Sequence, residues 1–189
     1  LDSGDGPFRD LLDDRSMWDE STVARGSRPL DYLRRLAAAP RSLVIHGNYL
    51  AQDEIAFVAA RRESMSIVFC PRTHHYFRHE PYPLPQMLAA GVRVALGTDS
   101  RASNPDLDML RELRFAAQRW SAVSPEAWLR MATLDAAAAL GLAASAGSLE
   151  QGRRADLVAV PCPGADPYEQ IVGGASPVAA VWLAGVRVR

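Results

Sequence analysis

Short apolar runs that alternate with helical patterns are the strongest constraint on how this 189-residue chain folds. Three such runs are apolar almost throughout, without polar residues at every second position. Strands of this kind are typical of a parallel sheet with helices on its faces. We therefore predict an α/β fold with parallel strands at residues 43–46, 66–70 and 92–97.

Helices are predicted between and after these strands from apolar residues at three- and four-residue steps and from proline and glycine at the ends. The predicted helices span residues 29–39, 52–63, 84–90, 107–120 and 125–140, with a brief one around residues 8–12. The stretch from Cys70 to His79 has neither a helical nor a strand period, so we expect a loop there.

The end of the chain has a different pattern, because it lacks the strand–helix repeat. A turn and a short strand are expected between Gly147 and Val160, and apolar runs at 178–183 and 186–188 flank Ala184-Gly185 as a tight hairpin. This tail is predicted to be β rather than βα. We accordingly divide the chain into an α/β part, residues 1–145, and a β segment, residues 146–189.

Composition excludes several classes of function. The net charge is −1 and no long basic block occurs, which argues against nucleic acid and anionic membranes as partners. No run of eighteen apolar residues and no signal peptide is seen, so the expected location is cytoplasmic and the expected partner a small molecule. Cys70 and Cys162 form no C-x-x-C pair, and Cys70 is expected to be a buried structural thiol.

Each predicted strand ends in polar residues, namely His46, the Cys70–His74 cluster and Asp99 with its neighbours. The carboxyl ends of parallel strands are where α/β folds collect ligands and catalytic groups. The three clusters therefore predict one shared site.

Asp99 is the first catalytic candidate, since a carboxylate at a strand end can bind a metal or accept a proton from water. From spacing alone it could equally cap the next helix. His46 ends its strand at the same level. A lone histidine is commonly structural, but its pairing with Asp99 across one intervening strand favours a catalytic role.

Three of the four histidines lie between Cys70 and His79, together with two arginines. Their spacing fits no standard zinc motif, so we favour substrate contact over metal ligation. His75 and His79 are expected to be surface residues. The predicted substrate-binding residues are Arg72, His74, Ser100 and Asn104.

Four segments, taken in order, carry a family resemblance. They are V-I-H-G-N-Y-L (44–50), F-C-P-R-T-H (69–74), G-V-R-V-A-L-G-T-D-S with A-S-N-P-D-L-D-M-L (91–110), and G-S-L-E-Q-G-R-R-A-D-L-V (147–158). The chain resembles the C-terminal half of the amidohydrolase superfamily, in the metal-dependent deaminase and chlorohydrolase branch that includes guanine, cytosine and adenosylhomocysteine deaminases.

The resemblance implies the last three strands of a (β/α)8 TIM barrel plus a small segment of a β-sandwich. It implies that His46 polarises the substrate or orients the attacking hydroxide. Asp99 is implied to be both a metal ligand and the base that activates water. The implied cofactor is one divalent metal, zinc or alternatively iron.

The chain departs from the family pattern in two respects. The family's His-x-His is absent and no histidine precedes His46, so we expect an incomplete fragment that is inactive alone and whose open sheet edges favour self-association. His74 stands where close deaminases tend to have asparagine, which leaves the substrate open.

The predicted function is hydrolytic deamination of a purine- or pyrimidine-like substrate, or hydrolysis of another C–N substrate, by metal-activated water. An amide- or halide-hydrolysing enzyme of the same fold is one alternative. A non-catalytic α/β ligand-binding domain is another, although no glycine-rich phosphate loop follows a strand.

Overall fold

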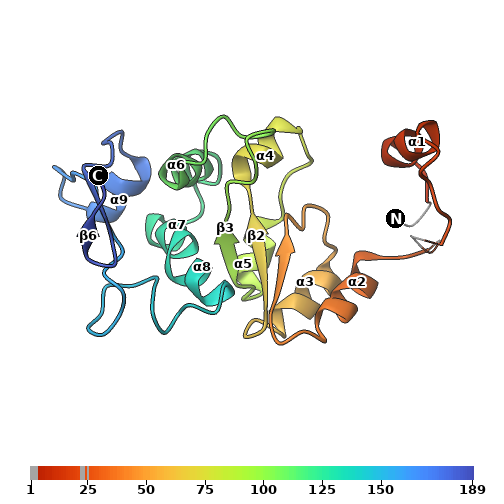
Figure 1. Ribbon diagram of the computed structural model, residues 1–189, viewed down its shortest axis with the longest axis horizontal. Coiled ribbons are helices and arrows are strands. Elements are labelled where there is room, and N and C mark those ends of the chain that lie inside the picture. The colour runs from red at the N-terminus through yellow and green to blue at the C-terminus, as the bar shows by residue number, and fades with distance from the viewer. Residues whose placement is uncertain (1–3, 22–23, 25) are drawn as a thin grey trace.

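Three parallel strands form the centre of the computed structural model, which describes residues 4–21, 24 and 26–189. The strands are β1 (Ser42–Ile45), β2 (Met65–Phe69) and β3 (Val94–Leu96), paired in that order. Ser42 lies opposite Met65, and Ile67 lies opposite Val94. All three strands point the same way, so their carboxyl ends lie at one edge of the sheet (Figure 1). The predicted parallel α/β arrangement is confirmed.

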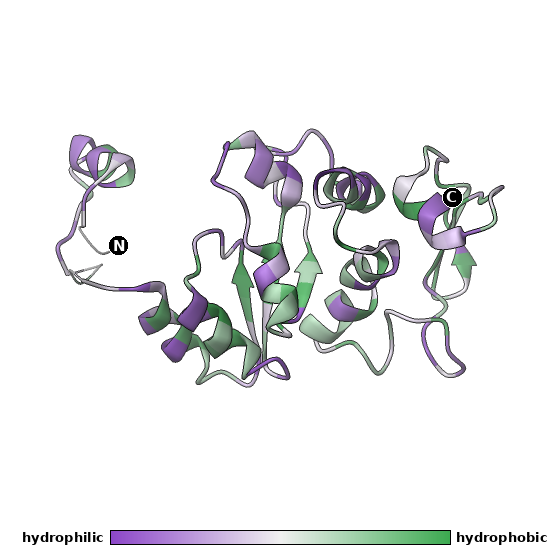
Figure 2. Ribbon diagram, turned by 180° about the vertical axis from the view of Figure 1, so that it is seen from behind, coloured by the Kyte–Doolittle hydropathy of each residue, from purple (hydrophilic) through white to green (hydrophobic). Residues whose placement is uncertain are grey.

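Helices pack against both flanks of this sheet. Their bounds are α2 Pro29–Leu36, α3 Gln52–Ala59, α5 Leu84–Ala89, α6 Met109–Arg119, α7 Pro125–Ala132 and α8 Leu134–Ala139. Helix α3 contacts β2, whereas α6, α7 and α8 contact β3. In Figure 2 the strands are green, which marks apolar residues, whereas the helices mix apolar and polar residues. Met65, Ile67 and Phe69 are buried in the core because both neighbouring strands and the helices cover β2.

The segment predicted as a loop after β2 contains a helix instead, α4 (Pro71–Tyr76). Proline favours the first helical position because its fixed φ suits a helix and it needs no N–H partner there. The helix buries Thr73 and His74 and packs on α6. Six residues are too few to display a helical period, so tertiary packing decides the conformation.

The predicted helix over 125–140 is in fact two helices, α7 and α8, because the backbone breaks at Thr133 with φ −128° and ψ −88°. The Thr133 hydroxyl donates to the carbonyl of Leu129 at 2.7 Å. The break lets both helices contact β3 as well as each other.

The tail forms a second, antiparallel sheet, β4 (Leu157–Ala159), β5 (Ala180–Leu183) and β6 (Val186–Arg187). The predicted hairpin is confirmed, with Ala184 and Gly185 at φ 50° and 81°. A helix that was not predicted, α9 (Pro167–Gly173), interrupts the tail. Its Val172 joins the main core and the helix packs on α6 and α7, so the tail is not purely β.

Helix α1 (Pro7–Asp14) matches the brief helix predicted near the start. It contains no buried residue and lies apart from the other elements (Figure 1). Among the described residues, no helix combines the length and apolar character that crossing a membrane requires.

Candidate active site

His46 and Asp99 meet at the edge where the parallel strands end. His46 directly follows β1 and Asp99 lies three residues beyond β3, so the two come from strands on either side of β2. The His46 Nε2 and Asp99 Oδ2 atoms are 3.6 Å apart, with side chains 37% and 32% exposed. The pair that the sequence placed at corresponding strand ends is thus close together and open to solvent.

Both residues have left-handed backbone, with φ 66° at His46 and 57° at Asp99. Residues other than glycine adopt this region rarely, and such strain concentrates at functional sites. Two hydrogen bonds fix the backbone of His46. Its N–H donates to the Val68 carbonyl at 2.8 Å, and its carbonyl accepts from the Tyr82 hydroxyl at 2.5 Å. The chain therefore turns sharply at both strand ends.

Gly97 allows β3 to approach the end of β2. A Cβ atom at this position would lie 2.7 Å from Val68 Cγ1 and 3.1 Å from Cys70 Sγ. Only a residue without a side chain fits there unless its neighbours move. Cys70 is buried as expected, and burial raises the pKa of its thiol to about 12.

Asp99 does not cap a helix, so that alternative is wrong. The cap of α6 is Asp108, whose carboxylate accepts from the Arg111 N–H at 3.0 Å. One carboxylate oxygen of Asp99 accepts from the Ser100 N–H at 2.7 Å, and the other lies toward His46.

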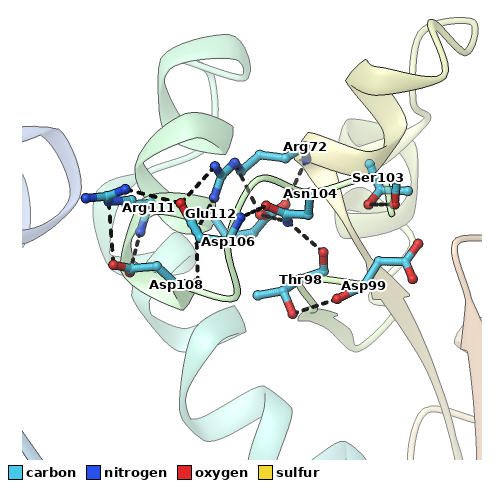
Figure 3. Close-up of polar contacts among 10 residues, drawn as sticks. Arg72, Thr98, Asp99, Ser103, Asn104, Asp106, Asp108, Arg111 and Glu112 are labelled. Carbon is cyan, nitrogen blue, oxygen red and sulfur yellow. Dashed lines mark hydrogen bonds and ion pairs between the residues drawn. The ribbon is translucent and has the colours of Figure 1, made fainter. Parts of the chain in front are cut away.

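Arg72 hydrogen-bonds to two carboxylates of the chain itself. Its guanidinium donates two hydrogen bonds to Asp106, at 2.8 and 3.3 Å, and its backbone N–H donates to Glu112 at 2.7 Å (Figure 3). Hydrogen bonding from Arg72 holds the pKa of the Asp106 carboxyl well below its usual range.

Asn104 is 2% exposed, and its amide nitrogen donates to the Thr98 carbonyl at 2.6 Å and to Glu112 at 2.8 Å. Glu112 is fully buried, which raises the pKa of its carboxyl. Sequence reasoning missed Glu112, although it lies on α6 beside Leu113 and one turn before Ala116, both on the buried face. Its place on the apolar face of this helix was the signal from which its burial could have been predicted.

His74 is 7% exposed among aromatic rings, including Tyr82 at 5.4 Å and Trp120 at 6.4 Å between centroids. Burial lowers the pKa of its imidazole, and its Nε2 has no hydrogen-bond partner within the described part of the chain. It lines a hollow of about 320 Å³.

The remaining predicted residues lie nearer the surface. Ser100 is exposed, and its hydroxyl accepts from the Ala102 N–H at 3.3 Å. His75 is exposed as expected, whereas His79 is half-buried and hydrogen-bonds to the Tyr49 hydroxyl at 2.7 Å. Substrate contact by Arg72, His74, Ser100 and Asn104 stays a prediction.

At this edge the described residues would offer a metal the Asp99 carboxylate and the His46 imidazole. No group of three or more His, Cys, Asp or Glu side chains suited to a metal occurs in residues 4–21, 24 and 26–189. Catalytic zinc takes three protein ligands as a rule. The described residues therefore do not complete a zinc site on their own.

The sequence profile of the amidohydrolase family matches residues 17–188, which is nearly the whole chain. The chain belongs to the amidohydrolase family. Two relatives named 5-methylthioadenosine/S-adenosylhomocysteine deaminase are similar to it. The protein from Moorella thermoacetica is 34% identical over 158 residues, and the one from Halobacterium salinarum is 39% identical over 143. These alignments cover 79% and 71% of this chain but only 36% and 32% of the relatives.

Solved structures agree with this assignment. A zinc-bound adenosine deaminase from Xanthomonas campestris matches with a TM-score of 0.79 and 33% identity, over 95% of this chain and 47% of that one. A zinc complex of atrazine chlorohydrolase from Arthrobacter aurescens matches with a TM-score of 0.76 and 26% identity, over 92% and 41%. The chain thus falls in the deaminase and chlorohydrolase branch and spans less than half the length of these proteins.

Proposed function

We propose that this amidohydrolase chain contributes Asp99 and His46 to the active site of a metal-dependent enzyme that deaminates a purine- or pyrimidine-like small molecule. The contact of 3.6 Å between these two side chains, at the carboxyl edge of a parallel sheet, is the observation that carries the proposal. Relatives named as deaminases support the reaction class.

Within this proposal, Asp99 takes a proton from the attacking water and returns one to the departing ammonia. A carboxylate with its free oxygen beside an imidazole is suited to such transfers. His46 hydrogen-bonds either the attacking oxygen or the substrate and so fixes the direction of attack. Asp99 is also the proposed ligand of one divalent metal, and the zinc in two structural neighbours favours zinc over iron.

The rest of the metal site would come from protein outside these 189 residues. Two facts support this idea. The described residues contain no group of three or more side chains that could hold a metal, and the chain spans about a third to a half of the proteins it matches. We infer that the chain forms the last three strands of a (β/α)8 barrel, with residues 146–189 as part of a β-sandwich. Alone, it is inactive. Cytoplasmic location and self-association through the open sheet edges belong to the same proposal.

A second candidate is hydrolytic removal of halide from a similar ring. The neighbour named atrazine chlorohydrolase favours it, since that structure matches over 92% of this chain. Addition of water to an electrophilic ring carbon serves both reactions, and the leaving group distinguishes them. Amide hydrolysis and a non-catalytic role are the weaker alternatives.

A substrate screen tests the proposal. Because these 189 residues are proposed to be inactive alone, the test uses the whole polypeptide that the gene encodes. It is purified and offered adenosine, 5′-methylthioadenosine, S-adenosylhomocysteine, guanine, cytosine and a chlorotriazine, while ammonia and chloride release are measured. We expect ammonia from at least one substrate, with loss of turnover under a metal chelator and recovery with zinc. Folded, zinc-supplied protein that releases ammonia from none of them would refute deamination.

A further inference from the structure

We propose that Glu112 and Asn104 are positioning residues that hold Asp99 in its working conformation, an inference that rests on the role proposed for Asp99. Neither residue faces the His46–Asp99 pair directly. They act through the backbone just before Asp99 and through the start of α4.

Asn104 fixes the peptide that precedes Asp99. Its amide nitrogen donates to the Thr98 carbonyl at 2.6 Å, as Figure 3 shows. Thr98 and Asp99 share one peptide unit, so anchoring this carbonyl restricts the rotation that sets the left-handed φ of 57° at Asp99. An aspartate keeps that conformation only where its surroundings over-determine it.

Glu112 fixes Asn104 in turn. Its Oε2 accepts from the Asn104 amide at 2.8 Å and its Oε1 accepts from the Arg72 N–H at 2.7 Å. Arg72 follows β2 and Asn104 follows β3, so one carboxylate joins the loops after two neighbouring strands. Both oxygens are needed as acceptors, and a glutamine offers only one.

The network is closed within the chain. The side-chain amide oxygen of Asn104 accepts from the Asp106 N–H at 3.4 Å. The Arg72 guanidinium binds Asp106, and the Nε atom of Arg72 lies 3.8 Å from the Glu112 carboxylate. With Glu112 fully buried and Asn104 2% exposed, their polar atoms are used to hold the loops. A role in placing Asp99 therefore fits their contacts better than contact with a substrate.

Glu54 offers a matched control. It is the other almost fully buried glutamate among the described residues, at 1% exposure. Like Glu112 it accepts a hydrogen bond on each carboxylate oxygen, in its case from the backbone N–H groups of Leu30 at 3.1 Å and Ala51 at 2.8 Å. It lies on α3 and joins that helix to α2. Glu54→Gln thus repeats the chemical change of Glu112→Gln without touching the Asp99 loop.

The first readout needs no activity. The Ser100 amide donates to Asp99 Oδ1 at 2.7 Å, so its NMR shift and its hydrogen-exchange rate report the placement of that carboxylate. In the 189-residue chain we expect Glu112→Gln and Asn104→Ala to shift this signal and to speed its exchange at least tenfold. Glu54→Gln should leave it unchanged. If Glu112→Gln does not fold, the Ser100 amide signal of Asn104→Ala tests the inference instead.

The second readout is turnover of the polypeptide expressed from its own gene. Loss of residues that orient catalytic groups typically lowers activity by about 10–100-fold, and we expect a fall of this size in kcat for both variants with little change in KM. A Ser100 amide and a kcat that both match the wild type would overturn the inference. Should Asp99→Asn retain turnover, the proposed function fails, while the Ser100 amide still decides whether Glu112 and Asn104 position Asp99.

Discussion

Replacement of Gly97 by alanine tests whether the close approach of β3 to β2 shapes the site. The new Cβ would lie 2.7 Å from Val68 Cγ1, a methyl that cannot move aside without turning the branched side chain or shifting β2. Overpacking of this kind typically destabilises by about 1–3 kcal/mol. For a chain of this size each kcal/mol lowers Tm by about 2–4 °C, so we expect a drop of about 2–12 °C.

Urea unfolding followed by circular dichroism measures the change in the free energy of unfolding. Two further variants show whether a steric clash causes that change. Gly173→Ala is the control because, apart from its chain neighbours and the backbone of its own helix, no atom lies within 4 Å of a Cβ there, and its stability should change by less than about 0.5 kcal/mol. In Val68→Ala/Gly97→Ala the clashing methyl is gone, so the double variant should be more stable than the sum of the single effects predicts, by at least about 0.5 kcal/mol. Additive effects, or a Gly97→Ala variant as stable as Gly173→Ala, would refute the steric reasoning.

Three further predictions follow from the same residues. Tyr82→Phe removes the hydrogen bond to the His46 carbonyl and should lower the free energy of unfolding by about 1 kcal/mol; an unchanged urea midpoint would count against it. Burial lowers the pKa of His74 below its ordinary 6.5, so as pH falls below that value the unfolded chain binds a proton before the folded one does. Stability should therefore be full above pH 6.5 and decline below it, less steeply in His74→Phe; parallel Tm curves for the two proteins would contradict this. With its pKa raised to about 12, Cys70 should resist iodoacetamide at pH 8 while the more exposed Cys162 is alkylated, as mass spectrometry would show, and equal labelling would refute the assignment.

The parallel sheet and the meeting of His46 with Asp99 were predictable because they depend on continuous apolar runs and on strand order. An apolar run such as Val94–Leu96, flanked by helical patterns, fits few conformations other than a buried parallel strand. Parallel strands then bring their carboxyl ends to one edge of the sheet. The short elements were not predictable in the same way. Helix α4 has six residues, so packing on α6 rather than periodicity determines it, and only Pro71 marked its start.

Polar residues on the buried faces of helices were also not predicted from the sequence. Glu112 is a charged residue in an amphipathic helix and was not among the predicted site residues, yet it is fully buried. Its partners, the Arg72 N–H and the Asn104 amide, lie 40 and 8 positions away along the chain, so nothing local shows that its charge is compensated. Buried polar networks are set by tertiary contacts, and a single sequence carries little trace of them.

The central claim is that Asp99 is the carboxylate on which hydrolysis depends. The most direct measurement compares wild type with Asp99→Asn in the polypeptide expressed from its own gene, recording turnover on the best substrate and bound metal by elemental analysis. The substitution preserves shape but removes the basic oxygen, so we predict that kcat falls by about 10²–10⁴-fold, the usual contribution of a general base, with loss of bound zinc. A folded variant that keeps both its zinc and its kcat would contradict the account.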